Sequence, residues 1–204
     1  DWGFVWIGTR DGLYKYNEGR ARSFPFLDST DFRRSNNVQS LLVTQDSILL
    51  IGLQLGGIMG VDLESLRPIP DNKIPQLPRE VSIICLHQDS EGTIWAGSSG
   101  SGIFQLRPGS EKWERFVSNE YAEDLKFIFD FEDQGDTLWL ATSGDHLLYY
   151  LKSQTSVYAL QANNSVRSVR NKVAGASGRC ELLRDETGRV YLVGGVCCES
   201  EILD

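Results

Sequence analysis

The stretch DSEGTIWAGSSGSGIFQL, residues 89–106, joins a turn signal to two short apolar runs that a glycine-rich break separates. Asp89 can accept hydrogen bonds from the backbone two residues further on, and Gly92 tolerates the positive φ that a tight turn needs. Trp95 stands in the middle of the first apolar run. The stretch therefore predicts a turn followed by two short strands, and it leaves open whether Trp95 binds a ligand or builds a repeated unit.

The same short run returns at a nearly constant spacing. Five runs align on their central residues: VWIGT on Trp6, LLIGL on Leu50, IWAGS on Trp95, LWLAT on Trp139 and VYLVG on Tyr191. The steps between them are 44, 45, 44 and 52 residues, and the longer last step coincides with the polar stretch 161–178, which reads as an inserted loop. The sequence thus predicts a repeat of about 44 residues, over residues 1–34, 35–77, 78–120, 121–163 and 176–204.

The apolar runs of each repeat have strand character. In LKFIFDF, which starts at Leu125, the apolar residues Leu125, Phe127, Phe129 and Phe131 fall on one face at period two. Repeats of paired helices need longer stretches at the helical period, and the sequence shows none. One twisted four-stranded sheet cannot cover both of its faces, whereas sheets packed face to face around an axis can. The sequence therefore predicts an all-β fold, a β-propeller of four-stranded antiparallel blades.

The predicted propeller is incomplete. Residues 1–204 form a single domain that starts at the second strand of its first repeat and stops soon after the second strand of its fifth. This amounts to about four and a half blades. We expect unpaired strand edges at both ends, unless the last repeat closes onto the first in a five-bladed ring.

The residues at the centre of the five aligned runs predict packing between blades. One large side chain per repeat at a fixed position is how stacked units cover one another, which favours a core role over sugar stacking. The expected blade core consists of Trp6, Leu50, Trp95, Trp139 and Tyr191.

Charge and hydropathy argue against several partners. The 204 residues carry 28 acidic and 20 basic side chains, a formal net charge of −8, which repels nucleic acids and anionic membranes. No run approaches the roughly 18 apolar residues of a membrane-spanning helix. We expect no nucleic acid partner and no direct membrane contact in this segment.

Residues that usually carry chemistry are few and scattered. His87 falls in a predicted strand and His146 in a predicted loop, and neither belongs to a nucleophile or zinc motif. Neighbouring carboxylates such as Glu132 and Asp133 are common in acidic chains and lack the setting that raises a pKa. We expect no catalytic residue, no metal ligand and no cofactor.

The four cysteines contain neither a C-x-x-C pair nor zinc spacing. Cys85 lies in the apolar run VSIICLH and is predicted to be buried as a small apolar side chain. A disulfide among Cys180, Cys197 and Cys198 stays open.

The repeated block has the form D-x-x-G-x-[IVL]-W-[IA]-G-[TS]-x-x-G-[LI], seen in DWGFVWIGTRDGL from Asp1 and in DSEGTIWAGSSGSGI from Asp89. It resembles the two-component regulator propeller repeat. The lead-in SNNVQSLLVTQD, residues 35–46, is similar to the family's Asn-x-Val approach to the first strand. The spacing differs from sialidase Asp boxes, and no Trp is followed by the Asp of WD repeats.

The resemblance implies a function. Propellers of this family form the extracytoplasmic sensor regions of bacterial hybrid histidine kinases, and the better understood members recognise carbohydrate fragments. It therefore implies a periplasmic segment that binds a small molecule or an oligosaccharide, with a homodimer through the parent sensor left open. The kinase modules that follow in the family are outside this segment, so the segment itself is not expected to be an enzyme.

The repeat geometry indicates where a ligand could bind. If the strands of a blade are named a to d, the D-x-x-G turns join a to b, so the b–c breaks share the opposite face with the d–a connections. Candidate ligand contacts in the b–c breaks are Thr9, Arg10, Asp11, Gln54, Ser98, Ser99, Ser143, Asp145 and His146. Two other functions remain open: a propeller for protein interaction or dimerisation, and a lyase or glycosidase on a propeller scaffold.

Overall fold

The computed structural model describes residues 4–25, 35–118, 120–143, 147–159, 180–184, 186, 190–194 and 201–203. These residues form five antiparallel sheets, which we number blades 1 to 5. Blade 1 contains β1 (Val5–Thr9), β2 (Gly12–Asn17) and β3 (Arg20–Phe24). Blade 2 contains β4 (Val38–Val43), β5 (Ile48–Leu53), β6 (Ile58–Asp62) and β7 (Arg67–Ile69). Blade 3 contains β8 (Ile83–Gln88), β9 (Ile94–Ser98), β10 (Ile103–Leu106) and β11 (Glu114–Phe116).

Blade 4 contains β12 (Ile128–Gln134), β13 (Thr137–Thr142), β14 (Leu148–Leu151) and β15 (Ser156–Ala159). Blade 5 contains β16 (Cys180–Arg184), β17 (Val190–Gly194) and β18 (Glu201–Leu203). Two short 3-10 helices, η1 (Asp71–Lys73) and η2 (Asp124–Lys126), precede β8 and β12. The predicted inserted loop 161–178 lies outside the described residues.

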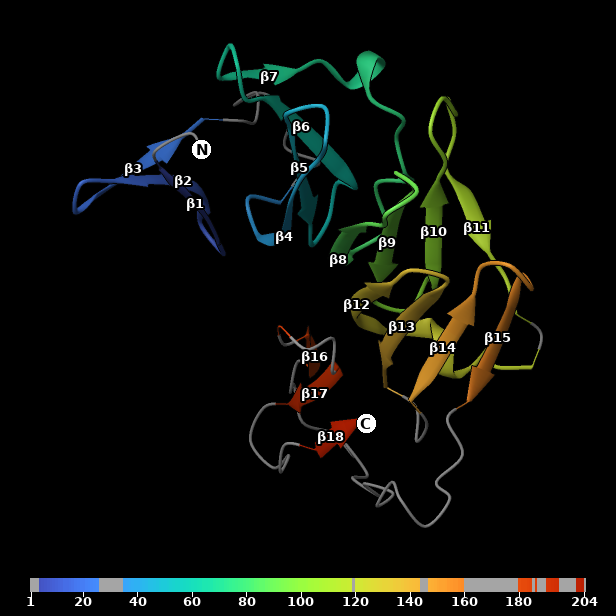
Figure 1. The fold of residues 1–204 in the computed structure, drawn as a ribbon. Coiled ribbons are helices and arrows are strands. Elements are labelled where there is room, and N and C mark those ends of the chain that lie inside the picture. Colours follow the sequence, from blue (N-terminus) through green and yellow to red (C-terminus); the bar gives the residue numbers. More distant parts are fainter. Residues whose placement is uncertain are drawn as a thin grey trace.

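The blades form an open arc, as Figure 1 shows. The first strands of successive blades, β4, β8, β12 and β16, lie beside one another, and the last strands lie outermost. Within the described residues, no strand of blade 5 pairs with a strand of blade 1. The predicted all-β, incomplete propeller is therefore confirmed, and closure into a five-bladed ring is not observed. Blade 5 contains a third strand, β18, beyond the two that the sequence indicates.

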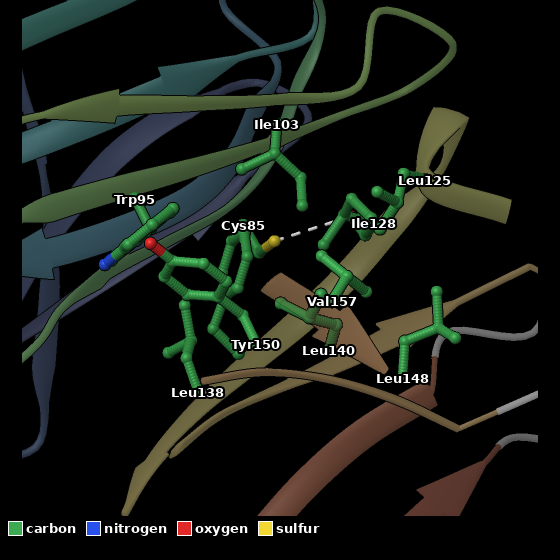
Figure 2. Packing of buried hydrophobic residues seen from close by; sticks show 11 residues of the cluster. Cys85, Trp95, Ile103, Leu125, Ile128, Leu138, Leu140, Leu148, Tyr150 and Val157 are labelled. Atoms are coloured by element: carbon green, nitrogen blue, oxygen red, sulfur yellow. Dashed lines mark hydrogen bonds between the residues drawn. The ribbon is translucent and has the colours of Figure 1, made fainter. Parts of the chain in front are cut away.

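Each hydrophobic core lies between two neighbouring blades. Trp95 of blade 3 is 3% exposed and packs with residues of blade 4, with its ring centroid 5.6 Å from that of Tyr150 and 6.4 Å from that of Phe131. Figure 2 shows Trp95 and Cys85 of blade 3 facing the leucines of blade 4. Leu50 of blade 2 packs in the same way against blade 3. The apolar faces of the blades thus cover one another.

The other three predicted core residues differ in exposure. Trp6 is half-buried and packs edge-on against Phe24, 4.9 Å between ring centroids, beside the core shared with blade 2. Trp139 is also half-buried and packs against the small core between blades 4 and 5. Tyr191 lies in the central strand β17, and its side chain is outside the described part.

The glycine of the repeated block allows the blades to approach closely. A Cβ built on Gly8 would lie 2.5 Å from Cγ1 of Val38 in the next blade, and one on Gly97 would lie 2.8 Å from Cβ of Ile128. A Cβ on Gly52 would meet Ile83 in the same manner. Each glycine thus makes room for a β-branched side chain of the following blade.

A β-bulge recurs in the first strand of blades 2, 3 and 4. Its register shifts lie between Val38 and Ser40, between Ile83 and Cys85, and between Ile128 and Asp130. The residue after the bulge reaches the next blade in two cases. Cys85 Sγ donates to the Ile128 carbonyl at 3.4 Å, drawn as a dashed line in Figure 2. Asp130 Oδ2 accepts from Leu182 N at 2.7 Å.

Cys85 is 6% exposed, which confirms the prediction of a buried side chain. Its thiol is free. Cys197 and Cys198 lie outside the described residues, as does the side chain of Cys180, so the question of a disulfide among them stays open.

The a–b turn of blade 3 has the form that the sequence predicts. Asp89 Oδ1 accepts from Glu91 N at 3.0 Å and from Thr93 N at 2.9 Å, and Gly92 has a φ of 85°. The second carboxylate oxygen accepts from Trp95 Nε1 at 2.9 Å. The aspartate and the tryptophan of the repeated block are therefore directly bonded, which adds a role for their fixed spacing.

The sequence also predicts turns that start at Asp46 and Asp133, because an Asp precedes the aligned runs of blades 2 and 4 as Asp89 does in blade 3. Both turns differ from that prediction. In blade 2, Thr44 rather than Asp46 starts the turn, because Thr44 Oγ1 accepts from Ile48 N at 3.2 Å. In blade 4, strand β12 continues through Asp133 to Gln134 and pairs Gln134 with Thr137, which leaves a two-residue turn. Asp133 is thus a strand residue, and its carboxylate is free to face the neighbouring blade.

Candidate functional site

The b–c loops lie against the segments that lead into the first strand of each blade, as the sequence predicts. Gln54 N donates to the Asn37 carbonyl at 3.0 Å, Ser99 N to the Ser82 carbonyl at 3.0 Å, and Ser143 N to the Phe127 carbonyl at 3.2 Å. We call this surface the b–c loop face. Backbone pairing fixes each loop close to the innermost strands, so exposed side chains of several blades are presented on one side of the arc.

Thr9 and Ser98 use their hydroxyls within their own turns. Thr9 Oγ1 donates to the Gly12 carbonyl at 2.9 Å and accepts from Asp11 N at 3.2 Å. Ser98 Oγ donates to the Gly102 carbonyl at 2.7 Å and accepts from Ser101 N, and the Ser98 side chain is 0% exposed. The structure therefore assigns these two hydroxyls to turn formation, and Ser98 offers no surface to a ligand.

Most of the remaining predicted contacts are exposed. Arg10, Asp11, Gln54, Ser99 and Ser143 all lie on the surface of the b–c loop face. Asp145 and His146 lie outside the described residues. Charged, amide and hydroxyl groups are thus available at several points along the arc.

Gln54 belongs to a chain of amides that the sequence-based prediction missed. Gln39 Nε2 donates to Asn37 Oδ1 at 2.6 Å, and Asn37 Nδ2 donates to Gln54 Oε1 at 2.8 Å. The chain holds the exposed Gln54 amide in a defined orientation. The sequence carries no signal for this bond, because Asn37 and Gln54 are 17 residues apart. An oriented amide of this kind suits a ligand with hydroxyl or carbonyl oxygens.

A buried charged cluster lies on the opposite, a–b turn face, between blades 3 and 4. Lys152 Nζ lies 2.7 Å from Asp133 Oδ1 and 3.5 Å from Asp89 Oδ2. The side chains of Lys152, Asp133 and Asp89 are 8%, 11% and 1% exposed. Asp133 Oδ2 also accepts from Ser90 N of blade 3 at 2.9 Å. We call these three residues the Lys152 cluster, and its bonds join the two blades.

The pKa values within the Lys152 cluster favour the charged forms. Burial alone would raise the pKa of Asp133, but the hydrogen bonds from Lys152 and Ser90 outweigh it, so this pKa is lowered. Burial alone would lower the pKa of Lys152, but the hydrogen bond to Asp133 and the nearby charge of Asp89 raise it. Both partners are therefore ionised near neutral pH, and the cluster is a structural ion network.

His87 lies on β8 beside this cluster. The sequence predicts His87 to be an ordinary strand residue whose ring is hydrogen-bonded. Its Nε2 is instead buried and has no hydrogen-bond partner among the described residues. Its ring centroid lies 6.5 Å from that of Phe131 in blade 4. Burial lowers the pKa of His87, Lys152 lowers it further, and the opposing charges of Asp133 and Asp89 do not compensate.

We expect His87 to make the chain less stable in mild acid. Its pKa in the folded state lies below the unfolded value of about 6.5, so its contribution to stability is complete above that pH and is lost as the pH falls. His87→Leu should reduce the pH dependence of the free energy of unfolding between about pH 7 and pH 5, by at most about 1.4 kcal/mol per pH unit. Urea titrations at several pH values measure this, with pH 8 as the reference. Equal slopes for both proteins would contradict the assignment.

Glu132 and Asp133 have opposite environments. Burial raises the pKa of Glu132 despite the charge of Arg184, whose Nε lies 3.2 Å from Glu132 Oε1. The sequence-based expectation that no setting raises a carboxylate pKa here was therefore wrong. Adjacent strand residues point to opposite faces of a sheet, and these two carboxylates contact blade 5 and blade 3 respectively. They do not converge on one point as a catalytic acid and base would.

A groove of about 440 Å³ lies between blades 2 and 3 on the a–b turn face. Ile48, Ile94 and Trp113 supply apolar lining, and Arg107 and Glu91 supply charge. Trp113 Nε1 donates to the Pro75 carbonyl at 2.9 Å, which fixes the ring in this wall. The sequence does not predict this groove, because it depends on how two blades pack.

The fold and these two loop faces define the chain as part of an open-arc β-propeller with exposed polar loops. Residues 76–100 match the family described as two component regulator propeller, so the chain carries this repeat. The match covers the whole of strands β8 and β9, where the repeated block is most regular. No curated protein matches the chain.

Solved structures show the same fold. The extracellular domain of BT4673 from B. thetaiotaomicron matches with 19% sequence identity and a TM-score of 0.67, covering 94% of this chain and 24% of that one. The extracellular domain of BT3049 from B. thetaiotaomicron, described as a hybrid two component system, matches with 16% identity and a TM-score of 0.66 over 93% and 25% of the two chains. PorZ of Porphyromonas gingivalis, a surface component of the type-IX secretion system, matches with 15% identity and a TM-score of 0.64 over 94% and 30%.

The chain thus spans about a quarter of the length of the two B. thetaiotaomicron domains. At these identities the likeness concerns the fold. Among the described residues, no helix has the length and apolar character that a membrane crossing requires. The same residues include no group of three or more His, Cys, Asp or Glu side chains placed to hold a metal ion.

Proposed function

We propose that the chain is part of the extracytoplasmic ligand-sensing propeller of a two-component signalling protein, located in the periplasm, and that it recognises a carbohydrate or oligosaccharide. The observation that carries the proposal is the two component regulator propeller repeat at residues 76–100, in a chain that shares its fold with extracellular domains of such systems. The segment binds and does not catalyse. Signalling belongs to other parts of the parent protein.

The b–c loop face supports this choice of ligand. Arg10, Asp11, Gln54, Ser99 and Ser143 present donors and acceptors, and the exposed side chains of Leu55 and Phe127 lie among them. Sugar hydroxyls are both donors and acceptors, so they suit a mixed polar surface held by a rigid scaffold. The orientation of the Gln54 amide through Asn37 reduces the entropy lost on binding.

We expect oligosaccharide binding to depend on Gln54 and Ser99. Each hydrogen bond contributes about 1 kcal/mol, so Gln54→Ala combined with Ser99→Ala should weaken binding by roughly 10-fold or more. Isothermal titration of the full chain against a panel of plant and host oligosaccharides measures the change. Gln45→Ala provides the matched control, because Gln45 is exposed at the groove on the opposite face.

The affinities of the Gln54→Ala/Ser99→Ala variant and of the Gln45→Ala variant show which of the two faces binds the oligosaccharide. Loss of affinity in the Gln45→Ala variant alone would move the binding site to the groove between blades 2 and 3. Absence of binding to any oligosaccharide in the panel would remove the support for a carbohydrate ligand.

The alternative of a protein-interaction or dimerisation propeller has no observation of its own. Val5, Ile7 and Tyr16 are 59%, 39% and 40% exposed on the face of blade 1 that points away from blade 2, which is the face on which a further blade packs in a propeller. A lyase or glycosidase would need converging acid and base groups, and the neighbouring carboxylates of Glu132 and Asp133 contact opposite blades.

A further inference from the structure

Blade 1 carries a row of basic side chains on one face. In the register of this sheet Trp6 pairs with Lys15, Lys15 pairs with Arg22, and Asn17 pairs with Arg20. Residues opposite one another on paired strands share a face, as do residues two apart, so Lys15, Asn17, Arg20 and Arg22 all lie on the face that carries Trp6. We call these four residues the blade 1 cationic face.

The fold does not require basic residues at these positions. Lys15 and Arg22 pair across the strands beside the core residue Trp6. In blade 2, Gly60 and Ile69 form the corresponding pair beside Leu50. In blade 3 it is Gln105 with Glu114, where Gln105 Nε2 donates to the Glu114 carboxylate at 3.4 Å.

In blade 4 the corresponding pair is Tyr149 with Tyr158, whose rings stack 5.5 Å apart. The three complete blades therefore fill this position with an apolar, a hydrogen-bonded and a stacked pair. Only blade 1 among these four blades places two like charges opposite one another, which is unfavourable unless something compensates.

No acidic side chain compensates this charge within the described residues. Lys15, Arg20 and Arg22 make no ion pair there, although the chain as a whole has a net charge of −8. Glu18, at the turn between β2 and β3, is the acidic residue that lines the same hollow, and it forms no ion pair with any described residue. Lys15 Nζ lies 3.6 Å from the centroid of the Phe4 ring, which holds the ammonium in place.

The same residues surround a hollow of about 490 Å³. Its lining consists of Lys15, Asn17, Glu18, Arg20 and Arg22, so three cations, one amide and one carboxylate line a space large enough for a ligand group. The hollow lies at the β2–β3 turn, the end of the blade that is opposite the b–c loop face. It is therefore separate from the surface described under the proposed function.

We propose that the blade 1 cationic face is a binding site for an oxyanion, the carboxylate or sulfate group of an acidic ligand. The guanidinium of Arg22 can donate two parallel hydrogen bonds to such a group, and the ammonium of Lys15 supplies a point charge from the adjacent strand. Arg20 and Asn17 extend the site towards the turn, so a ligand with a second anionic or hydroxyl group would gain further contacts. The anion relieves the repulsion between Lys15 and Arg22.

The test is titration of the full chain with four probes at low and at physiological ionic strength. The probes are inorganic sulfate, a sulfated dextran oligosaccharide, the same dextran without sulfate, and an oligogalacturonate. The expected result is binding of the sulfated or the carboxylated oligosaccharide at least 10-fold tighter than of neutral dextran. The affinities of the sulfated dextran and of the oligogalacturonate show whether the site prefers a sulfate or a carboxylate group. Affinity should fall as salt increases.

The double variant Lys15→Gln with Arg22→Gln should lose at least 10-fold in affinity for the acidic probe. The matched control is Arg67→Gln with Lys112→Gln, which removes the same two charge types from exposed positions of blades 2 and 3 and should change affinity less than 2-fold. Because the first variant removes like-charge repulsion, its unfolding midpoint in urea should be equal to or above that of the unchanged chain.

Equal losses in both double variants would overturn the site, as would the absence of binding to every anionic probe at low ionic strength. The result is independent of the proposed sugar site on the b–c loop face. If the affinity for a neutral oligosaccharide falls in the Gln54 variant and not in the Lys15 variant, the result supports the proposed function alone. If the affinity for the acidic probe falls in the Lys15 variant and not in the Gln54 variant, the result supports the anion site alone.

Discussion

Lys152→Met is expected to lower the free energy of unfolding by about 3 to 5 kcal/mol, because it leaves two buried carboxylates without a counter-charge. Asp89 and Asp133 are 1% and 11% exposed, so water cannot replace the ammonium effectively. The loss falls on the contact between blades 3 and 4, since Asp89 belongs to one and Asp133 to the other. Urea unfolding followed by tryptophan fluorescence measures the change, with Trp95 bonded to Asp89 as a local reporter.

An exposed ion pair provides the matched control. Lys126 and Glu123 lie 2.6 Å apart with side chains 47% and 85% exposed, so Lys126→Met should cost less than about 1 kcal/mol. Combining Lys152→Met with Asp133→Asn should recover part of the lost free energy of unfolding, because one of the two unpaired buried charges is then removed. Equal effects of Lys126→Met and Lys152→Met would show that the Lys152 cluster does not hold the blades together.

The pH dependence of the Lys152 cluster has a defined sign. The pKa of Asp133 is lowered in the folded state, so its contribution to stability is present above the unfolded pKa of about 3.9 and is lost as the pH falls through the folded value. The pKa of Lys152 is raised, so its contribution is lost only as the pH rises through that higher value. The cluster therefore stabilises the chain across the neutral range.

The fold was predictable because its signals are local. The Asp89 turn and the block around each of Trp6, Trp95 and Trp139 depend on residues a few positions apart. The predicted alternation in residues 125–131 was wrong, because Leu125 lies in η2, Phe127 is 39% exposed, and a register shift between Ile128 and Asp130 puts Phe129 and Phe131 against different blades. Period two together with a constant repeat length leaves few architectures other than a propeller. The structure adds the physical reason for the glycine in the block, which is the close approach of the next blade.

The candidate site was less predictable because it depends on contacts between repeats. Ser98 and Ser99 are neighbours in one loop, yet the first is buried in its own turn and the second is exposed. The sequence pattern treats them alike. The Gln54 amide chain and the contacts of Lys152 join residues from different segments of the chain, so no fixed spacing in the sequence predicts them.

Asp133 illustrates the same limit at a single residue. The sequence places it at the start of a turn because a glycine and a tryptophan follow, but the glycine comes one position earlier than in blade 3. That shift closes a two-residue turn, extends β12 and directs the carboxylate towards Ser90 and Lys152. A one-residue change in a turn therefore converts a local turn residue into a contact between blades.

Gly97→Val is the second substitution with a large expected effect, about 3 kcal/mol of lost stability. A Cβ at this position would lie 2.8 Å from Cβ of Ile128 and would also overlap Sγ of Cys85, so blades 3 and 4 would have to move apart. Overpacking a rigid core costs about 1 to 3 kcal/mol, and the cost is higher when backbone atoms must shift. Urea unfolding should show the change in midpoint, and Gly97→Ala should give a smaller loss in the same direction.

Gly109→Ala separates this steric effect from backbone strain. A Cβ on Gly109 would meet nothing within 4 Å, but the φ of 76° disfavours any other residue, so the expected loss is about 1 kcal/mol. Gly97 has no such positive φ, so its effect comes from steric overlap with Ile128 of blade 4 and with Cys85 of its own blade. Blade 4 carries Ala141 at the equivalent position and packs it against Leu182, which shows that a Cβ fits where the next blade leaves room. If Gly97→Val cost no more than Gly109→Ala, close packing of the blades would not be the reason for the glycine.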